Sequence, residues 1–271
     1  VVAAATGLLS ENSETVRATW ISIHISCVFF ALLAATMTSF SAVFHICNAQ
    51  WVRPIRRLFE SASYFFQVAA LLFVISYFGK EYIFPWATTE PVGRGPWFIP
   101  NFVYGRDILL YLFVCFLART VVRYSISRDI CAIRGGLVKG SKEKLSRWSD
   151  DSFDSYATLL ESSKAVDAIK MATHKMARFS PAVVIFFAIG LALIGDDMLM
   201  STDPNWFSTL FGVWIFMSGV YITMAFTGML VLYARGSELY RIRIGRKTLH
   251  DLGKLLGGFG IFWAYMFWSH Y

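Results

Sequence analysis

Charged residues are scarce in this sequence. Only 16% of its 271 residues are Asp, Glu, Lys or Arg, and 56% are hydrophobic, whereas a soluble domain carries about 25% charged residues. This composition argues against a water-soluble domain with a single core. The net charge of +7 does not indicate nucleic-acid binding, because the basic residues lie in short loops between apolar stretches rather than in one solvated patch.

Histidine and cysteine are also few, and their spacing supports no metal or haem site. The four cysteines occur singly, without a Cys-x-x-Cys pair, so neither a zinc site nor a redox motif is indicated. A haem held by two histidines needs them on facing helices at matching depth. His24 and His45 lie on one predicted helix about 31 Å apart, and His270 completes no pair. We predict that the chain itself binds neither metal nor haem.

Apolar stretches dominate the chain, and six of them are long enough to cross a bilayer. About 20 predominantly apolar residues are needed to cross roughly 30 Å of hydrocarbon. We therefore predict an all-α fold, a polytopic bundle of transmembrane helices that occupies the whole chain. The third span is the shortest, and Arg106 and Arg119 near its ends would anchor it at the interfaces. The predicted spans are 20–48, 61–84, 108–122, 180–200, 206–233 and 252–271.

The basic residues are distributed unevenly between the loops. The loops after the first, third and fifth spans hold 21 of the 25 Lys and Arg residues, and cytoplasmic loops carry this excess. The first span is thus predicted to enter from the outside. The cytoplasmic segment is 125–178, in which 153–176 has the spacing of an amphipathic surface helix. On the outside, 81–106 is rich in proline and aromatic residues, which predicts an ordered, irregular cap.

Ionisable groups near the membrane edges form two predicted layers. Because charge is costly within a membrane span, each such group is a functional candidate. The outer layer contains Arg106, Asp107, Asp196, Asp197, Asp203 and His270, and the inner layer contains His45, Glu60, Arg119, Asp251 and Lys254, with His250 beside the last two. None of these groups is predicted to be a catalytic residue.

The carboxylates of the outer layer have two readings. Asp196 and Asp197 repel each other, which favours a proton on one of them and suits a proton donor or acceptor. The alternative is that both face water at the end of the fourth span. Asp203 stands directly before Pro204, a pattern typical of a helix cap, here for the fifth span.

The inner end of the last span carries a second group with two readings. His250, Asp251 and Lys254 share one helix face, so they form either a structural ion pair or part of a proton relay. A relay would join them to Asp197 and His270. Hydroxyl groups of neighbouring helices would have to bridge the interval, and the candidates are Ser218, Thr223 and Thr227.

Two stretches near the end of the chain resemble a known family. The first is Ser201–Gly212, with the sequence STDPNWFSTLFG, and the second combines His250–Leu256 (HDLGKLL) with Phe262–Tyr265 (FWAY). Both are similar to the NrfD-like, polysulfide-reductase-type integral membrane subunits, most of all to the second such subunit, the F subunit, of bacterial alternative complex III. The chain departs from the family beside Asp197, where the family has flanking tryptophans.

The resemblance implies a membrane subunit of a respiratory quinol:electron-acceptor oxidoreductase in the bacterial inner membrane. Such subunits have about ten spanning helices, so the chain is expected to be a window on a longer protein, with 1–9 as the end of an earlier span. The expected partners are a second NrfD-like subunit, a multihaem cytochrome c subunit and an iron–sulfur subunit. These partners are expected to carry haem c and iron–sulfur clusters, whereas this chain is expected to bind no cofactor of its own, with a quinone as the one possible ligand.

Three functions remain open at this point. The first is a scaffold and proton conduit within a complex of the alternative complex III type. The second is a catalytic, quinone-binding NrfD-like subunit of another reductase, which requires a quinone near Asp197 and His270. The third is a secondary transporter, which requires discontinuous helices arranged as an inverted repeat.

The first prediction concerns orientation. A cysteine introduced by Ser141→Cys should react with a membrane-impermeant reagent only after the cells are opened, because the basic segment around it is predicted to face the cytoplasm. Cysteine labelling of intact and permeabilised cells measures this. Labelling of the introduced cysteine in intact cells would contradict the predicted orientation of every span.

Overall fold

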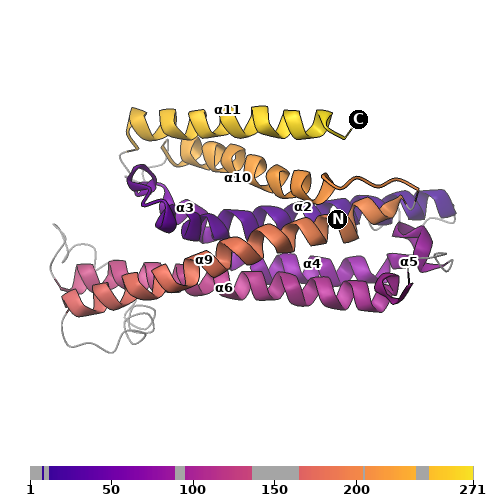
Figure 1. Cartoon of the computed structure of the whole chain (residues 1–271), viewed down its shortest axis with the longest axis horizontal. Coiled ribbons are helices and arrows are strands. Elements are labelled where there is room, and N and C mark those ends of the chain that lie inside the picture. The colour runs from indigo at the N-terminus through magenta and orange to yellow at the C-terminus, as the bar shows by residue number, and fades with distance from the viewer. Residues whose placement is uncertain are drawn as a thin grey trace.

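Long helices running side by side form the fold of the chain (Figure 1). The computed structural model describes residues 8, 12–88, 95–135, 165–203, 205–235 and 244–270, and these contain helices and turns but no strand. The long helices are α2 (Ser13–Ile46), α4 (Phe66–Phe78), α6 (Pro100–Arg134), α9 (Ala165–Met198), α10 (Phe211–Arg235) and α11 (Arg246–Trp268). The shorter ones are η1 (Gln50–Val52), α3 (Arg56–Ser61), η2 (Ala62–Phe65), α5 (Lys80–Ile83), η3 (Pro85–Ala87), η4 (Gly95–Phe98) and η5 (Met200–Thr202).

Five helical segments are long and apolar enough to cross a membrane. They are Ser13–Ile46, Arg56–Phe78, Pro100–Arg134, Ala165–Thr202 and Phe211–Ala234. The chain is therefore a multi-pass helical membrane protein, as its composition predicts. Following the predicted orientation, we call the end of the bundle that holds the last residues of α2 the inner end, and the opposite one the outer end.

The sixth predicted span, 252–271, is helical but does not have the composition of the other five. It corresponds to most of α11 and is not among the five apolar segments found in the described residues. Asp251, Lys254 and several glycines lower its mean hydropathy. Helix α11 lies at one side of the bundle, against α10 (Figure 1).

Two helices are longer than predicted. The predicted third span, 108–122, is the middle of α6, which continues for 35 residues, about 52 Å at 1.5 Å per residue. The predicted boundary near residue 180 does not exist either, because α9 runs without interruption from Ala165 through Pro181 to Met198. The predicted helix 153–176 is thus helical from residue 165 onward, but as the first part of α9 rather than a separate helix, and 153–164 lie outside the described residues.

The inner ends of α6 and α9 extend side by side past the other helices (Figure 1). Tyr124 and Phe179 stack with ring centroids 6.3 Å apart, and Cys131 packs in a small buried cluster with Ala168 and Ala172. Because α6 is 35 residues long and exceeds roughly 30 Å of hydrocarbon, it is longer than a membrane span requires. The length of the apolar runs does not predict this extension of α6 and α9, because most of the exposed residues of the extension are polar.

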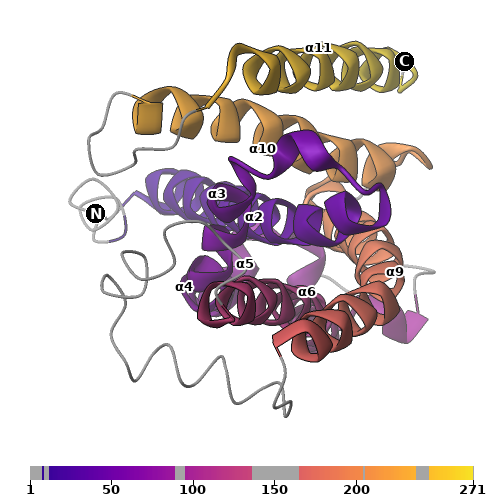
Figure 2. The ribbon, with the colours of Figure 1, turned by 90° about the vertical axis from the view of Figure 1, so that its left-hand side faces the viewer.

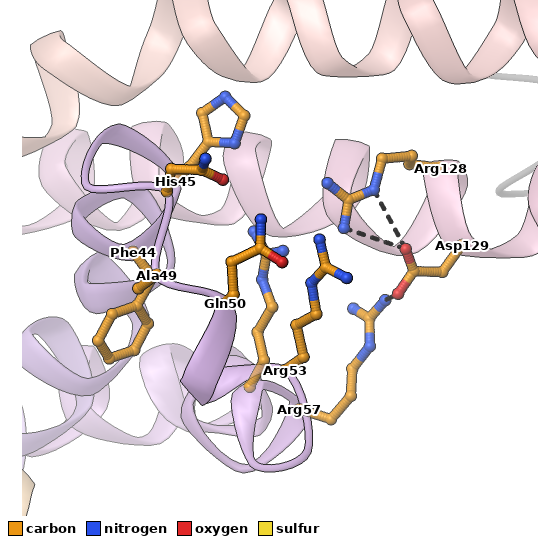
Figure 3. Close-up of a pocket in the computed structure, with 10 residues that line it drawn as sticks. Phe44, His45, Ala49, Gln50, Arg53, Arg57, Arg128 and Asp129 are labelled. Atoms are coloured by element: carbon orange, nitrogen blue, oxygen red, sulfur yellow. Dashed lines mark hydrogen bonds and ion pairs between the residues drawn. The ribbon is translucent and has the colours of Figure 1, made fainter. Parts of the chain in front are cut away.

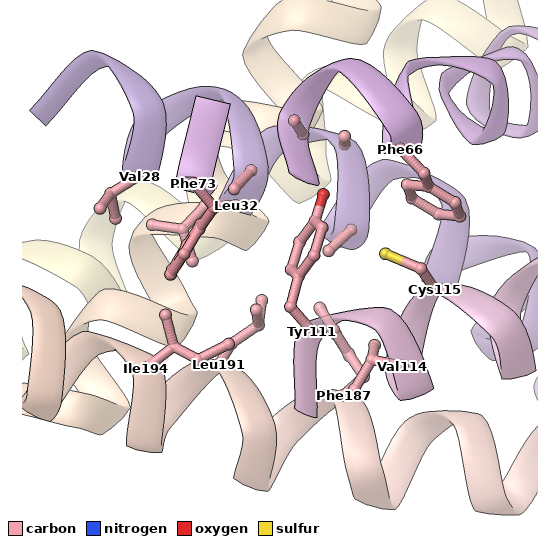
Figure 4. Close-up of a cluster of buried hydrophobic side chains, with 14 of the residues drawn as sticks. Val28, Leu32, Phe66, Phe73, Tyr111, Val114, Cys115, Phe187, Leu191 and Ile194 are labelled. Atoms are coloured by element: carbon pink, nitrogen blue, oxygen red, sulfur yellow. The ribbon is translucent and has the colours of Figure 1, made fainter. Parts of the chain in front are cut away.

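Helix α2 occupies the centre of the bundle, with α4, α6, α9 and α10 around it (Figure 2). Its middle residues are buried almost without exception. Figure 4 shows the core where α2, α4, α6 and α9 meet, with the rings of Phe73 and Tyr111 stacked 6.0 Å apart. Burial on all sides from Ala31 to Ala42 explains why this part of α2 carries no charged residue.

The outer cap is irregular only up to residue 99. Short helices α5, η3 and η4 form it, and Trp86 is buried, with its indole Nε1 donating a hydrogen bond of 3.0 Å to the carbonyl oxygen of Ser201. From Pro100 onward, the predicted cap is instead the first part of α6, where proline is well tolerated. The segment 1–9, predicted as the end of an earlier span, lies outside the continuously described residues.

Candidate functional site

A buried ionic group joins α6 to α9 at the outer end. Arg106 donates to the Oδ1 atom of Asp107 over 3.1 Å and forms a second ion pair with Asp197. Asp107 is fully buried and Asp197 is 5% exposed. The structure thus brings together three of the outer-layer residues that the sequence indicates. We call Arg106, Asp107 and Asp197 the outer ionic group.

The outer ionic group holds more carboxylates than cations. One guanidinium faces two carboxylates, and the Oδ2 atom of Asp107 has no hydrogen-bond partner among the described residues. Arg106 also lies over the ring of Trp97, 4.1 Å from its centroid, a cation–π contact that fixes the guanidinium. Two carboxylates that share one cation can exchange a proton with a ligand or with water.

Beside this group lies a cavity of about 420 Å³ with aromatic walls. Trp97, Phe98, Trp206 and Phe207 contribute rings, and Asp196 and Asp197 contribute carboxylates. Asp196 also lies against the start of α10, because its Oδ2 atom is 2.7 Å from the position that a Cβ atom on Gly212 would occupy. Apolar walls with a few polar groups are typical of small-molecule sites.

Gly212 is needed where α10 begins. A Cβ atom at this position would lie 2.6 Å from the carbonyl oxygen of Ala192 in α9, so only glycine lets α10 start this close. Asp203 does not cap this helix. Its Oδ1 atom accepts from the N–H of Asn205 over 3.0 Å, eight residues before α10 begins at Phe211, so the predicted helix cap is a turn instead.

His270 lies near the cavity but does not join the ionic group. Its Nδ1 atom is 2.8 Å from the hydroxyl oxygen of Ser208, and its ring packs against Trp206 and Trp214. Trp206 is therefore a shared neighbour of His270 and the cavity. No hydrogen bond links His270 to Asp197 in the described part of the chain, and its Nε2 atom is buried without a partner there.

The predicted inner group on α11 is not assembled. His250 and Lys254 are exposed and Asp251 is half-buried, and no ion pair joins any of them to another described residue. Their shared helix face therefore points away from the bundle, where α11 has few neighbours. A proton relay along α11 has no support in this geometry.

The buried charge at the inner end is Glu60 instead. It is 2% exposed and accepts hydrogen bonds from the hydroxyls of Ser41 over 2.9 Å and Ser125 over 2.7 Å. Arg56 and Arg57 pair with it from the preceding turn of α3. We call Glu60, Arg56 and Arg57 the inner ionic group. The sequence places Glu60 in the inner layer. Arg56 and Arg57 precede it by four and three residues, a spacing that indicates ion pairs on one helix face.

His24 is a structural contact between four helices, which sequence reasoning missed. Its ring nitrogens contact the hydroxyl of Ser76 in α4 and, over 2.7 Å, the carbonyl oxygen of Met198 in α9. The Ser76 hydroxyl is in turn 3.2 Å from the hydroxyl of Tyr104 in α6. Both nitrogens of His24 are thus used in holding the outer ends of α2, α4, α6 and α9 together.

Several buried hydroxyls between the two ionic groups have no hydrogen-bond partner in the described residues. They are those of Thr36, Ser39, Tyr111, Thr223 and Thr227. Thr36 lies where α2 and α10 touch, because its Oγ1 atom is 2.7 Å from the position that a Cβ atom on Gly219 would occupy. Ser218, by contrast, accepts from the indole of Trp263 over 2.7 Å. Buried hydroxyls normally find partners, so water is the expected one here.

No model of a known protein family matches the chain, and no curated protein matches it. Among the described residues, no three His, Cys, Asp or Glu side chains are grouped as metal ligands.

A second prediction follows from the outer ionic group. Arg106→Gln should destabilise the protein by about 3–5 kcal/mol, because it leaves Asp107 and Asp197 buried without their cation. Adding Asp107→Asn and Asp197→Asn to the same chain should restore most of the loss, since neutral amides need no counter-charge. Thermal unfolding in detergent measures both effects, with Arg17→Gln as an exposed control. Equal stability of the wild type and Arg106→Gln would show that the guanidinium does not compensate these carboxylates.

Proposed function

We propose that this chain is a membrane subunit of a respiratory quinol:electron-acceptor oxidoreductase of the alternative complex III type, where it acts as a scaffold and proton conduit. The resemblance of Ser201–Gly212 and His250–Leu256 to NrfD-like subunits supports the complex. One observation supports the conduit: buried ionic groups at both ends of the bundle are separated by hydroxyls that lack protein partners among the described residues.

The proposed proton route differs from the one that the sequence indicates. It starts at the inner ionic group and follows α2 and α10, which both run from the outer to the inner end. The route would pass Thr227, Thr223 and Thr36. Thr223 and Thr227 are about 6 Å apart along the axis of α10. Tyr111, one turn inward of Asp107 on α6, would connect it to the outer ionic group. Water would fill the intervals, as the unpartnered hydroxyls require.

The aromatic cavity at the outer end favours one alternative, a quinone-binding subunit. Rings of Trp97 and Trp206 can stack on a quinone head group, and Asp197 can accept a hydroxyl hydrogen bond from a quinol. In this version, the outer ionic group takes the proton that quinol oxidation releases. A secondary transporter has less support, because the described spans show one internal 3-10 interruption, η2, and no second one paired with it.

A third prediction tests the conduit. Asp197→Asn should lower proton-coupled quinol oxidation by at least tenfold, since positioned proton-transfer groups typically contribute about 10²–10⁴-fold. The complex is purified through a tag on this chain and measured in proteoliposomes. The matched control is Glu81→Gln, an exposed carboxylate at the same end of the bundle.

The same preparation tests the proposed complex. Wild-type protein should carry a c-type cytochrome and an iron–sulfur protein through purification in mild detergent. A preparation without either partner would contradict the assignment to a quinol-oxidising complex. Unchanged proton uptake in an assembled Asp197→Asn complex would contradict the role as a proton conduit, and only the role as a scaffold would remain.

A further inference from the structure

A second polar cavity, of about 350 Å³, lies at the inner end beside the last turn of α2. Four arginines from three neighbouring segments line it, namely Arg53, Arg56, Arg57 and Arg128. The first follows η1, the next two belong to α3, and the last comes from α6. Figure 3 shows Arg53 and Arg128 reaching from different elements toward the space beside His45 and Gln50.

The charges around this cavity do not balance. Two carboxylates accompany the four guanidinium groups: Glu60 pairs with Arg56 and Arg57, and Asp129 pairs with Arg57 and Arg128. Four positive and two negative charges leave a surplus of two positive charges. No carboxylate among the described residues pairs with Arg53.

A donor in the cavity wall also lacks a partner. The Nη2 atom of Arg56 is buried and makes no hydrogen bond to the described residues, although the Nε atom of the same side chain reaches Glu60 over 3.2 Å. A buried guanidinium N–H needs an acceptor. The positive-inside rule requires basic residues on this side of the membrane, but it does not require four of them to converge on one cavity.

We propose that this cavity binds a phosphate group, supplied by an anionic phospholipid of the adjacent leaflet or by inorganic phosphate. Guanidinium groups present planar pairs of donors that match phosphate oxygens, and the phosphate neutralises the surplus positive charge. The volume lies near the lower end of small-molecule sites, roughly 300–1,000 Å³. This site is separate from the outer cavity and does not depend on the proposed redox complex.

The double variant Arg53→Gln/Arg128→Gln tests the site without dismantling it. Asp129 keeps Arg57 as a partner, and Glu60 keeps Arg56 and Arg57, so the ion pairs that hold α3 to α6 remain. The matched control is Arg246→Gln, which removes an exposed arginine at the inner end of α11. Thermal unfolding of each variant shows that it is folded before binding is measured.

Two probes distinguish the sources of the phosphate group. Inorganic phosphate is titrated into delipidated full-length chain by calorimetry, and phosphatidylglycerol retained after detergent exchange is counted by native mass spectrometry, with phosphatidylcholine as the comparison lipid. We expect the double variant to lower affinity for inorganic phosphate, or retention of phosphatidylglycerol, at least tenfold relative to both the wild type and Arg246→Gln. The first outcome assigns free phosphate and the second a lipid head group. The proposal is overturned if neither probe separates the double variant from Arg246→Gln, which includes the case in which neither probe binds.

Discussion

A carboxylate inside a membrane protein is stable only when cations or hydrogen-bond donors surround it, and this constraint organises both ends of the bundle. Glu60 receives two arginines and two serine hydroxyls, and Asp107 and Asp197 share Arg106. Removing one partner from such a buried pair costs about 3–5 kcal/mol, because it leaves an uncompensated buried charge.

The same constraint separates structural from functional charge. In the described residues, His24 uses both ring nitrogens in contacts that join helices, so it is part of the frame. The outer ionic group has one cation for two carboxylates, and the inner cavity has surplus arginines around Glu60 and Asp129. A buried carboxylate or guanidinium that lacks a protein partner needs a proton, an anion or water in that partner's place. The proposed conduit and the proposed phosphate site both rest on that imbalance.

The helical bundle was predictable because apolar runs and basic loops follow directly from the cost of exposing polar groups to lipid. Helix ends were not, since polar residues continue α6 to Arg134 and α9 begins at Ala165. Arg106, Asp107 and Asp197 belong to the predicted outer layer because they lie at the ends of apolar runs, but the pairing of Arg106 with Asp197 was not predictable from spacing. The serine partners of Glu60 depend on where α2 and α6 lie beside α3, and the isolation of Lys254 depends on α11 lying at the edge. Neither arrangement is encoded in local spacing.

The account depends most on the buried hydroxyls of α10 carrying water between the ionic groups. Thr223→Val/Thr227→Val keeps the shape of both side chains and removes their hydroxyls, and Thr120→Val is the matched control, because its hydroxyl already donates to the carbonyl oxygen of Phe116 over 2.8 Å. The measurement is proton uptake coupled to quinol oxidation in proteoliposomes that contain the intact complex. We predict at least a tenfold loss in the double variant and none in the control. Unchanged uptake in an assembled double variant would contradict the proton route.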